Sequence, residues 1–376
     1  MAIPLILLSL GHFCVDLYSC ALGALQPLLV RRFGMTLTEA GILGGALIFS
    51  SSVMQPLYGF LSDRFHTKLF TALSPAVAGV FISTLGIAPN FKWLLAMVLA
   101  GGAGTAAFHP QASSRVTYGV KTNRGAWMAA FISAGTLGAA LGPTYFSTIA
   151  TRLGLGHTWV AAVPGVLVSM LLFITLPDAP GDPNSRERFD WAPLKAVARP
   201  LTILYLLVFL RSVVQVSFTQ FLPLYLNLER GYTPAKASYI LTAYLAAGAL
   251  GGFLGGHLAD RFGGRNVILI SMIASVPFLA LFFWTRGVLS IVGLCLGGLI
   301  LLFTIPVNVL MAQELAPSQS GTVSALMMGF AWGMAGLVFI PLIGVLADSY
   351  TLHRVLASLT VVPLIGFLLT MKLEKA

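Results

Sequence analysis

Ionisable side chains are rare in the apolar stretches of this sequence, and the first stretch holds two of them, His12 and Asp16. An imidazole titrates near physiological pH, so this pair could take up and release a proton. Polar or small residues continue along the stretch at intervals of three and four, which places them on one helical face. The pattern predicts a helix that lines a cavity; the alternative is a seam of hydrogen bonds between buried helices. The face consists of His12, Asp16, Ser19, Gly23 and Gln26.

Two further ionisable residues, His109 and Arg211, also lie inside apolar stretches. If the stretches span a membrane, each charge at its centre costs at least ~2.5–3.5 kcal/mol, so such residues usually face a cavity and take part in function. At 1.5 Å per residue, Asp16 and Arg211 both fall near mid-membrane, where an opposite pair, direct or through substrate, is tolerable. His12 and His109 are expected to meet nearer the cytoplasm, unless both are neutral and bonded to their neighbours. Asp16 is the candidate for a coupling proton.

Neutral polar residues within the stretches are candidates for contact with a solute. Gln55 and Asn308 lie in mid-stretch, and Gln215 shares the helical face of Arg211. Gln220 lies nearly opposite that face, and no role follows for it from the sequence.

Composition places the whole chain in a lipid environment. Of its 376 residues, 57% are hydrophobic and 9% are charged, whereas soluble domains carry roughly 25% charged residues. The net charge of +10 comes from 22 Lys and Arg scattered singly or in pairs, without the basic patch that nucleic acid requires. The three cysteines lie in apolar runs and read as buried apolar residues. The sequence predicts neither a metal site nor a cofactor.

Twelve apolar stretches are long enough to cross a bilayer, and in lipid they must be helices because the backbone has no other hydrogen-bond partner. The first is predicted to be a retained helix rather than a signal peptide, since it lacks a basic start. A polar segment at 177–199 divides the chain into domains 1–176 and 200–376 and is predicted to be a cytoplasmic linker. The stretches lie at 4–30, 38–60, 69–88, 93–113, 125–149, 157–176, 200–227, 233–256, 267–285, 289–311, 321–346 and 354–372.

Basic residues predict the orientation. With the N-terminus inside, 13 Lys and Arg fall in cytoplasmic loops and tails and 8 fall in outer loops, with Arg211 within a span. This bias predicts a multi-pass protein of the inner membrane with both termini in the cytoplasm.

The two halves of the chain repeat each other. Gly59-Phe-Leu-Ser-Asp63-Arg64 recurs as Gly256-His-Leu-Ala-Asp260-Arg261, displaced by 197 residues. Two prolines within spans recur at nearly the same offset, Pro110 as Pro306 and Pro143 as Pro341. Three marks at nearly one offset predict an all-α protein of two pseudo-symmetric six-helix bundles.

The repeated loop resembles the signature loop of the major facilitator superfamily. Its second copy is the fuller one, since it continues to Arg265, whereas only Lys68 follows the first. The resemblance implies the major facilitator fold, a functional monomer, and a structural and gating role for the loops. Glu314, at the cytoplasmic end of its span, is expected to cap a helix or form a pair at the inner gate. The loop residues are Gly59, Asp63, Arg64, Gly256, Asp260, Arg261 and Arg265.

A second motif, Gly138-Ala-Ala-Leu-Gly142-Pro143, is similar to the first half of a motif of superfamily antiporters. Phe146 and Ser147 stand where its second half has two glycines. The resemblance implies antiport; the alternative is close packing of small residues around a proline kink.

Three more segments, with Gln55-Pro56, resemble the fosmidomycin-resistance type of bacterial efflux transporter. The resemblance implies proton-driven drug export and antibiotic resistance, with a small solute, protons and the bilayer as partners. Arg211 and two histidines keep open a proton-coupled importer or facilitator of a small anionic metabolite. A membrane-embedded enzyme is the distant alternative, because no nucleophile beside a base, metal spacing or phosphate loop appears. The segments are Ser9–Asp16 with Pro27–Leu29, Phe108–Pro110 with Ser113–Arg115, and Ala312–Pro317 leading into Gly329–Met334.

Overall fold

The computed structural model describes residues 2–65, 67–117, 124–178 and 192–373. Within these ranges the chain forms helices and connecting turns, and no strand. Eleven segments are long and apolar enough to cross a membrane. Between the fourth and fifth of them lies α8 (Arg124–Leu153), a helix of 30 residues. The prediction of twelve spanning helices is therefore met by eleven strongly apolar segments and one less apolar helix.

The first half of the chain supplies six of these spans, several of them built from more than one segment. Pro56 explains one break: it has no N–H to donate to the carbonyl of Ser52, and the helix widens there into a π-helical turn. The segments are α1 (Ala2–Ser19) and α2 (Ala21–Phe33); α3 (Leu37–Ile48), η1 (Phe49–Val53) and α4 (Gln55–Phe65); α5 (Leu69–Ala72), α6 (Ser74–Ser83) and η2 (Leu85–Ile87); α7 (Phe91–Thr117); α8 (Arg124–Leu153); and η3 (Leu155–Ala162) with α9 (Val163–Thr175).

The second half supplies the other six. A short helix, α10 (Ala192–Ala196), lies in the segment that the sequence assigns to the linker. The spans are α11 (Ala198–Leu228); α12 (Pro234–Phe262); α13 (Gly264–Trp284); α14 (Gly287–Leu301) with α15 (Thr304–Leu315); η4 (Pro317–Gln319), α16 (Ser320–Ala325), η5 (Leu326–Phe330) and α17 (Ala331–Ser349); and α18 (Leu352–Ser358), η6 (Leu359–Val361) and α19 (Val362–Thr370).

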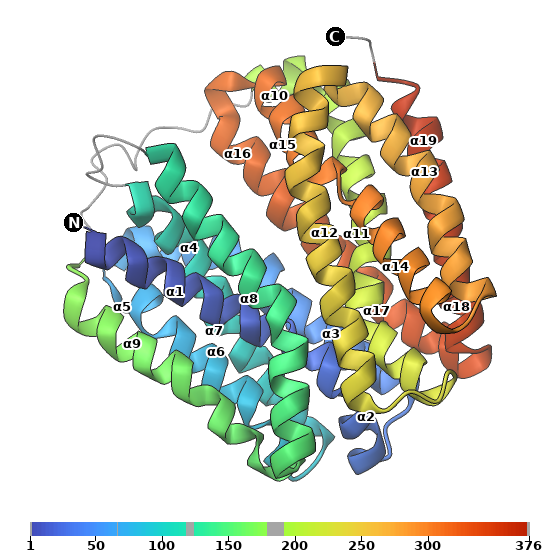
Figure 1. Ribbon diagram of the computed structural model, residues 1–376. Helices are drawn as coiled ribbons and strands as arrows, with labels where there is room; N and C mark the ends of the chain where they lie inside the picture. The colour runs from blue at the N-terminus through green and yellow to red at the C-terminus, as the bar shows by residue number, and fades with distance from the viewer. Residues whose placement is uncertain (1, 66, 118–123, 179–191, 374–376) are drawn as a thin grey trace.

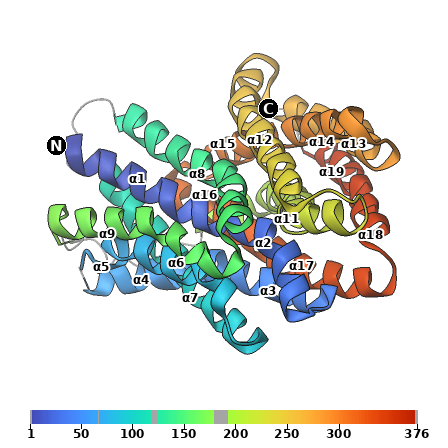
Figure 2. The same cartoon turned by 60° about the horizontal axis from the view of Figure 1, so that its bottom comes forward.

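The two halves form two helical bundles that meet at one end of the molecule (Figure 1). There α3 packs on α17, α2 on α11, and α8 on α12. Figure 2 shows α2 and α3 beside α17 from another side. We call the end that holds Leu37 and Ser349 the contact end. The bundles lean apart toward the opposite end, which carries both termini and which we call the terminal end.

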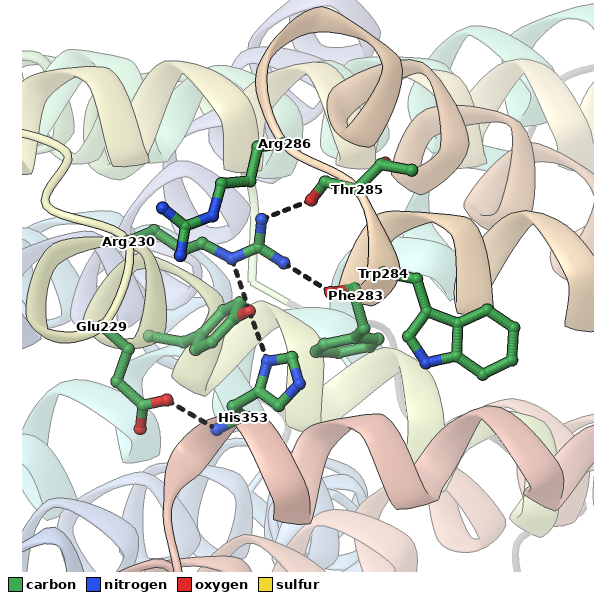
Figure 3. A pocket seen from close by; sticks show the side chains of 8 residues that line it. Glu229, Arg230, Phe283, Trp284, Thr285, Arg286 and His353 are labelled. Carbon is green, nitrogen blue, oxygen red and sulfur yellow. Dashed lines mark hydrogen bonds between the residues drawn. The ribbon is translucent and has the colours of Figure 1, made fainter.

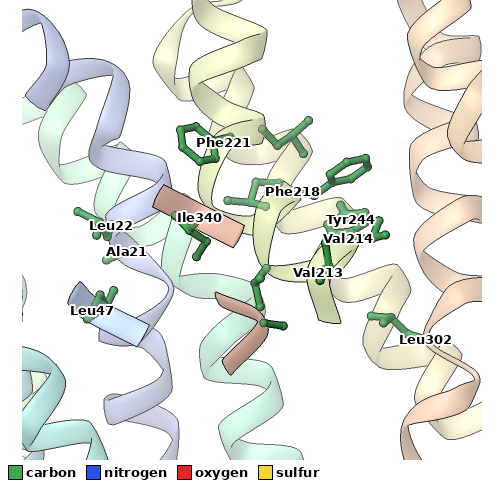
Figure 4. Packing of buried hydrophobic residues seen from close by; sticks show 14 of the residues in the cluster. Ala21, Leu22, Leu47, Val213, Val214, Phe218, Phe221, Tyr244, Leu302 and Ile340 are labelled. Atoms are coloured by element: carbon green, nitrogen blue, oxygen red, sulfur yellow. The ribbon is translucent and has the colours of Figure 1, made fainter. Parts of the chain in front are cut away.

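Small residues let the backbones of the two bundles touch at the contact end. A Cβ at Gly41 would lie 2.8 Å from the carbonyl oxygen of Ile340, and one at Gly344 would lie 2.4 Å from that of Leu37. Buried apolar side chains from both bundles fill the space next to these contacts (Figure 4), among them Leu22, Leu47, Phe218, Phe221 and Ile340. The bundle interface is therefore closely packed, like the interior of each bundle.

The repeated loops occupy matching positions in the two bundles. Gly59 faces the ring of Pro110, and Gly256 faces that of Pro306. Arg265 donates from Nε to the carbonyl oxygen of Leu373 over 2.8 Å and so fixes the C-terminal segment.

Most polar loop residues make few contacts in this conformation. Arg64 and Asp260 are exposed, and Arg261 lies over the ring of Phe262. Glu314 is exposed at the end of α15 and forms no ion pair or hydrogen bond with a described residue. The side chain of Asp63 lies outside the described residues. Among the residues that the structure describes, Glu314 thus makes neither the cap nor the pair that the sequence predicted for it.

Candidate functional site

Three ionisable side chains from two helices meet in the first bundle. Nε2 of His12 lies 3.3 Å from Oδ2 of Asp16, and Nε2 of His109 lies 3.4 Å from Oδ1 of the same carboxylate. The two imidazole rings stand edge to face with centroids 5.1 Å apart. The side chain of Asp16 is 20% exposed and that of His109 is 24% exposed. We call these three residues the His–Asp–His site.

The partner of the other ring nitrogen of His12 sets its protonation. Nδ1 lies 2.7 Å from the carbonyl oxygen of Phe131. A carbonyl only accepts hydrogen bonds, so Nδ1 must carry a hydrogen. In a neutral imidazole, Nε2 would then present a lone pair to the Asp16 carboxylate at 3.3 Å. Two acceptors at this distance repel each other, so the geometry requires one additional proton, on His12 or on Asp16.

Close packing of α8 on α1 holds this arrangement. Phe131 stacks on the ring of His12 with centroids 4.2 Å apart. One turn further along α8, a Cβ at Gly135 would lie 2.4 Å from Nε2 of His12 and 2.7 Å from Oδ2 of Asp16. Only glycine leaves room for the pair at this crossing.

The glycines of the antiporter-like motif lie on the same face of α8. A Cβ at Gly138 would lie 2.1 Å from the carbonyl oxygen of Phe13, and one at Gly142 would lie 2.4 Å from that of Leu17. Pro143 is buried in a helix that continues through it. In this structure the motif therefore sets the distance between α8 and α1.

We predict that Gly135→Ala disturbs the His–Asp–His site, because its methyl group displaces the imidazole or the carboxylate, and that it lowers any transport that depends on this site by at least about tenfold. Overpacking of this kind costs typically ~1–3 kcal/mol, so the variant should still fold. Gly156→Ala is the matched control, since no atom lies within 4 Å of a Cβ at that position. Transport is compared in liposomes, and equal rates for wild type and Gly135→Ala would contradict the prediction.

The ligand atoms of His12, Asp16 and His109 all lie within 4.8 Å of one another. Two imidazoles and a carboxylate are a set that a transition-metal ion accepts. The sequence predicted no metal site because the third group lies 93 residues from the second. A hydrogen between His12 and Asp16 is enough to account for their contact.

Arg211 occupies the interior of the second bundle without an acidic partner. Its side chain donates from Nη1 to Oε1 of Gln215 over 3.0 Å and from Nη2 to Oγ of Ser212 over 3.2 Å. Arg211 is 5% exposed, and its Nε has no hydrogen-bond partner among the described residues. The direct ion pair with Asp16 that the sequence left open is absent here, because that carboxylate contacts the two histidines. Arg211 is thus a buried cation whose charge no described carboxylate neutralises.

The three neutral polar residues that the sequence predicted to contact a solute lie in different surroundings. Gln55 donates to the carbonyl oxygen of Ser51 over 2.9 Å and lies near Gly329 of the other bundle. Gln215 is half-buried beside Arg211. Asn308 is fully buried, and within the part of the chain that the structure describes neither polar atom of its amide has a hydrogen-bond partner. Asn308 can therefore reach a solute only after its helix moves.

The polar face of the first span divides into two parts. The helix breaks at Cys20, between α1 and α2. Beyond the break Gly23 touches the backbone of Thr219 in the other bundle, and Gln26 is buried and donates to Ala40. In this conformation the second half of the face is therefore a buried seam, as in the alternative that the sequence left open, and a cavity-lining role for the whole span stays a prediction. Gln220 packs on Gly44 in that seam.

A second polar cluster, which the sequence did not reveal, lies at the contact end of the second bundle. Arg230 donates to carbonyl oxygens at the end of α13, including that of Thr285 over 2.6 Å, and to the hydroxyl of Tyr225 over 2.6 Å (Figure 3). The same hydroxyl bonds Nδ1 of His353 over 2.9 Å. These groups, with Glu229, line a cavity of about 250 Å³. Apart from the Tyr225 hydroxyl, the partners that the structure gives Arg230 are backbone carbonyls, so we interpret this arginine as a structural link between spans.

Comparisons with known proteins identify the family. The sequence profile of the Major Facilitator Superfamily matches residues 8–340. An uncharacterized MFS-type transporter, YfnC of Bacillus subtilis, is 31% identical over 97% of this chain and 91% of its own length. The fosmidomycin resistance protein of Escherichia coli is 28% identical over 96% of this chain and 90% of its own length.

A solved structure shares the fold over nearly the whole chain. It is a bacterial homologue of the human lysosomal transporter Spinster, in an inward-facing and occupied conformation. The TM-score is 0.83 at 15% identity, over 98% of this chain and 95% of that one.

The chain belongs to the Major Facilitator Superfamily. It is a multi-pass membrane protein and a secondary transporter of small molecules, not an enzyme.

Proposed function

We propose that this protein is a proton-coupled secondary transporter that exports a small solute, with the His–Asp–His site as its proton-binding site. The observation that carries the proposal is the contact between Nε2 of His12 and Asp16 at 3.3 Å: because Nδ1 already donates to the carbonyl of Phe131, this contact requires an additional proton on one of the two side chains. Because Asp16 retains 20% exposure, water can reach it to deliver or remove that proton.

Alternating access would connect this site to transport. We propose that residues 1–176 and 200–376 move as two bodies joined by 177–199, as a functional monomer in the inner membrane. With both termini in the cytoplasm, the contact end faces outward, and the present conformation is inward-facing. The solved homologue of Spinster is described as inward-facing. We further propose that the repeated loops and Glu314 engage when the terminal end closes.

Export is favoured over import by two resemblances. The glycine motif of α8 is similar to that of antiporters, and the relative from Escherichia coli is a fosmidomycin resistance protein. Import of a small anion is the second candidate, because Arg211 is a buried cation without a carboxylate partner. Either direction requires that substrate and proton occupy the protein in a linked manner.

Reconstitution into liposomes with an imposed pH gradient tests the proposal. Small solutes, with fosmidomycin among them, are added while a pH-sensitive dye reports the lumen. Exchange of a solute against protons supports export, and movement of both in one direction supports the importer. If no solute that is transported moves protons, the proposal is wrong. Where no solute tested is transported, proton release or uptake on addition of solute to the purified protein replaces the flux.

A further inference from the structure

Asp348, in the last turn of α17, reaches from the second bundle to the first residues of α3 in the other. Its Oδ1 accepts the backbone N–H of Leu37 over 2.9 Å. Its Oδ2 accepts the backbone N–H of Thr38 over 2.8 Å and the hydroxyl of the same residue over 2.6 Å. One carboxylate of the second bundle thus receives three hydrogen bonds from the first.

The start of α3 depends on this carboxylate for its hydrogen bonding. The first N–H groups of a helix have no partner within it and carry a partial positive charge. Within the first bundle, only the third of these N–H groups has a side-chain acceptor: the hydroxyl of Thr36 accepts from the N–H of Glu39 over 3.0 Å. The carboxylate of Glu39 in turn accepts from the N–H of Thr36 over 2.9 Å. The carboxylate of Asp348 accepts hydrogen bonds from the first two N–H groups, those of Leu37 and Thr38. The cap of α3 is therefore complete only when the bundles touch at the contact end.

Close backbone packing explains how so short a side chain crosses the interface. Gly344 lies one turn before Asp348, and a Cβ there would lie 2.4 Å from the carbonyl oxygen of Leu37. Any larger residue at 344 would push α17 away from α3. Because Asp348 is itself exposed, water can take over its hydrogen bonds once the bundles separate.

We propose that Asp348 is a gating residue that holds the contact end shut. Alternating access must open this end, and all three hydrogen bonds join groups on opposite sides of the opening. They therefore stabilise the present conformation and not the one open at the contact end, which is what shifts an equilibrium between two states. The inference rests on alternating access alone and is independent of the proton assigned to Asp16.

The test compares Asp348→Asn with Glu229→Gln. Glu229 is a matched control because it also caps a helix start, accepting the N–H of Leu352 over 2.7 Å and that of His353 over 3.0 Å. Both of those partners belong to its own bundle. Removing that cap weakens α18 equally in every conformation, whereas removing the cap by Asp348 weakens only the present one.

The readout is the distance distribution between spin labels on exposed positions of the two bundles, Arg152→Cys and Arg286→Cys. The labels are placed in full-length protein whose Cys14, Cys20 and Cys295 are replaced by alanine, reconstituted into lipid nanodiscs. We expect Asp348→Asn to raise the ratio of open to closed contact ends at least about tenfold, or about 1.4 kcal/mol. Glu229→Gln should leave the ratio within twofold of wild type.

Two outcomes would overturn the proposal: an unchanged ratio in Asp348→Asn, or an equal shift in Glu229→Gln. Should Asp348→Asn fail to fold, Thr38→Val replaces it, since valine keeps the shape of threonine and removes one of the three donors. That variant should shift the ratio in the same direction by a smaller factor. A ratio equal to that of wild type would count against the proposal as well.

Discussion

Asp16→Asn is expected to abolish accumulation driven by a pH gradient while leaving downhill exchange of substrate. Asparagine has the shape of a protonated aspartic acid but cannot release a proton. The carboxylate lies 3.3 Å and 3.4 Å from two imidazoles, so its loss removes the centre of the His–Asp–His site. Alternating access changes the water exposure of this group and with it its affinity for protons. Flux into liposomes with and without the gradient measures both activities.

A purely structural role for Asp16 predicts a different result. In that case the asparagine variant either folds poorly or accumulates substrate as the wild type does. Thermal stability and gel filtration separate the first case from a specific loss of coupling. His157→Gln is a control for changes to histidine in general, because His157 is exposed and lies outside the site. Full pH-driven accumulation by a well-folded Asp16→Asn protein would move the coupling role to His12 or His109.

Arg211→Met is expected to abolish transport and to keep or raise thermal stability. Arg211 is 5% exposed and its guanidinium makes two hydrogen bonds to neutral groups, so its burial is costly. A buried cation without an acidic partner among the described residues is explained if it binds an anionic group during the cycle. Methionine has a similar volume without the charge, so it removes that cost without leaving a large cavity. Transport rates and melting temperatures of the two proteins are the measurements.

Lysine at the same position distinguishes the kind of contact. Arg211→Lys retains part of the transport activity if a point charge suffices, and little of it if a bidentate hydrogen bond from the guanidinium is needed. Active and destabilised Arg211→Met protein would show that the arginine is structural.

Much of the fold follows from the sequence because lipid leaves the backbone few choices. The predicted spans differ from the observed helices mainly at their ends; the stretch 233–256, for example, continues as helix to Phe262. Sequence reasoning placed the end at the polar turn, although a helix can extend beyond the lipid. The span 125–149 stands apart, since α8 is rich in Gly and Ala, which serve close packing on α1 rather than contact with lipid.

The site could be predicted only in part. Helical spacing joins His12 to Asp16, but no spacing rule fixes the distance to His109 on α7. Two further contacts in the proposals involve backbone groups. The backbone carbonyl of Phe131 contacts His12. The side chain of Asp348 accepts hydrogen bonds from backbone N–H groups of α3. Such partners leave no mark in side-chain patterns. Asp348 also lies just beyond the predicted stretch 321–346, and a charged residue in a loop is too common to indicate a function.

Proton release on substrate binding tests the central claim most directly, namely that the His–Asp–His site holds a proton linked to the substrate. Substrate is added to purified protein in weakly buffered solution, and the pH is recorded for wild type and Asp16→Asn. The account predicts release by the wild type, none by Asp16→Asn, and wild-type release by His157→Gln. Equal release by wild type and Asp16→Asn, or no change of pH in the wild type, would contradict it.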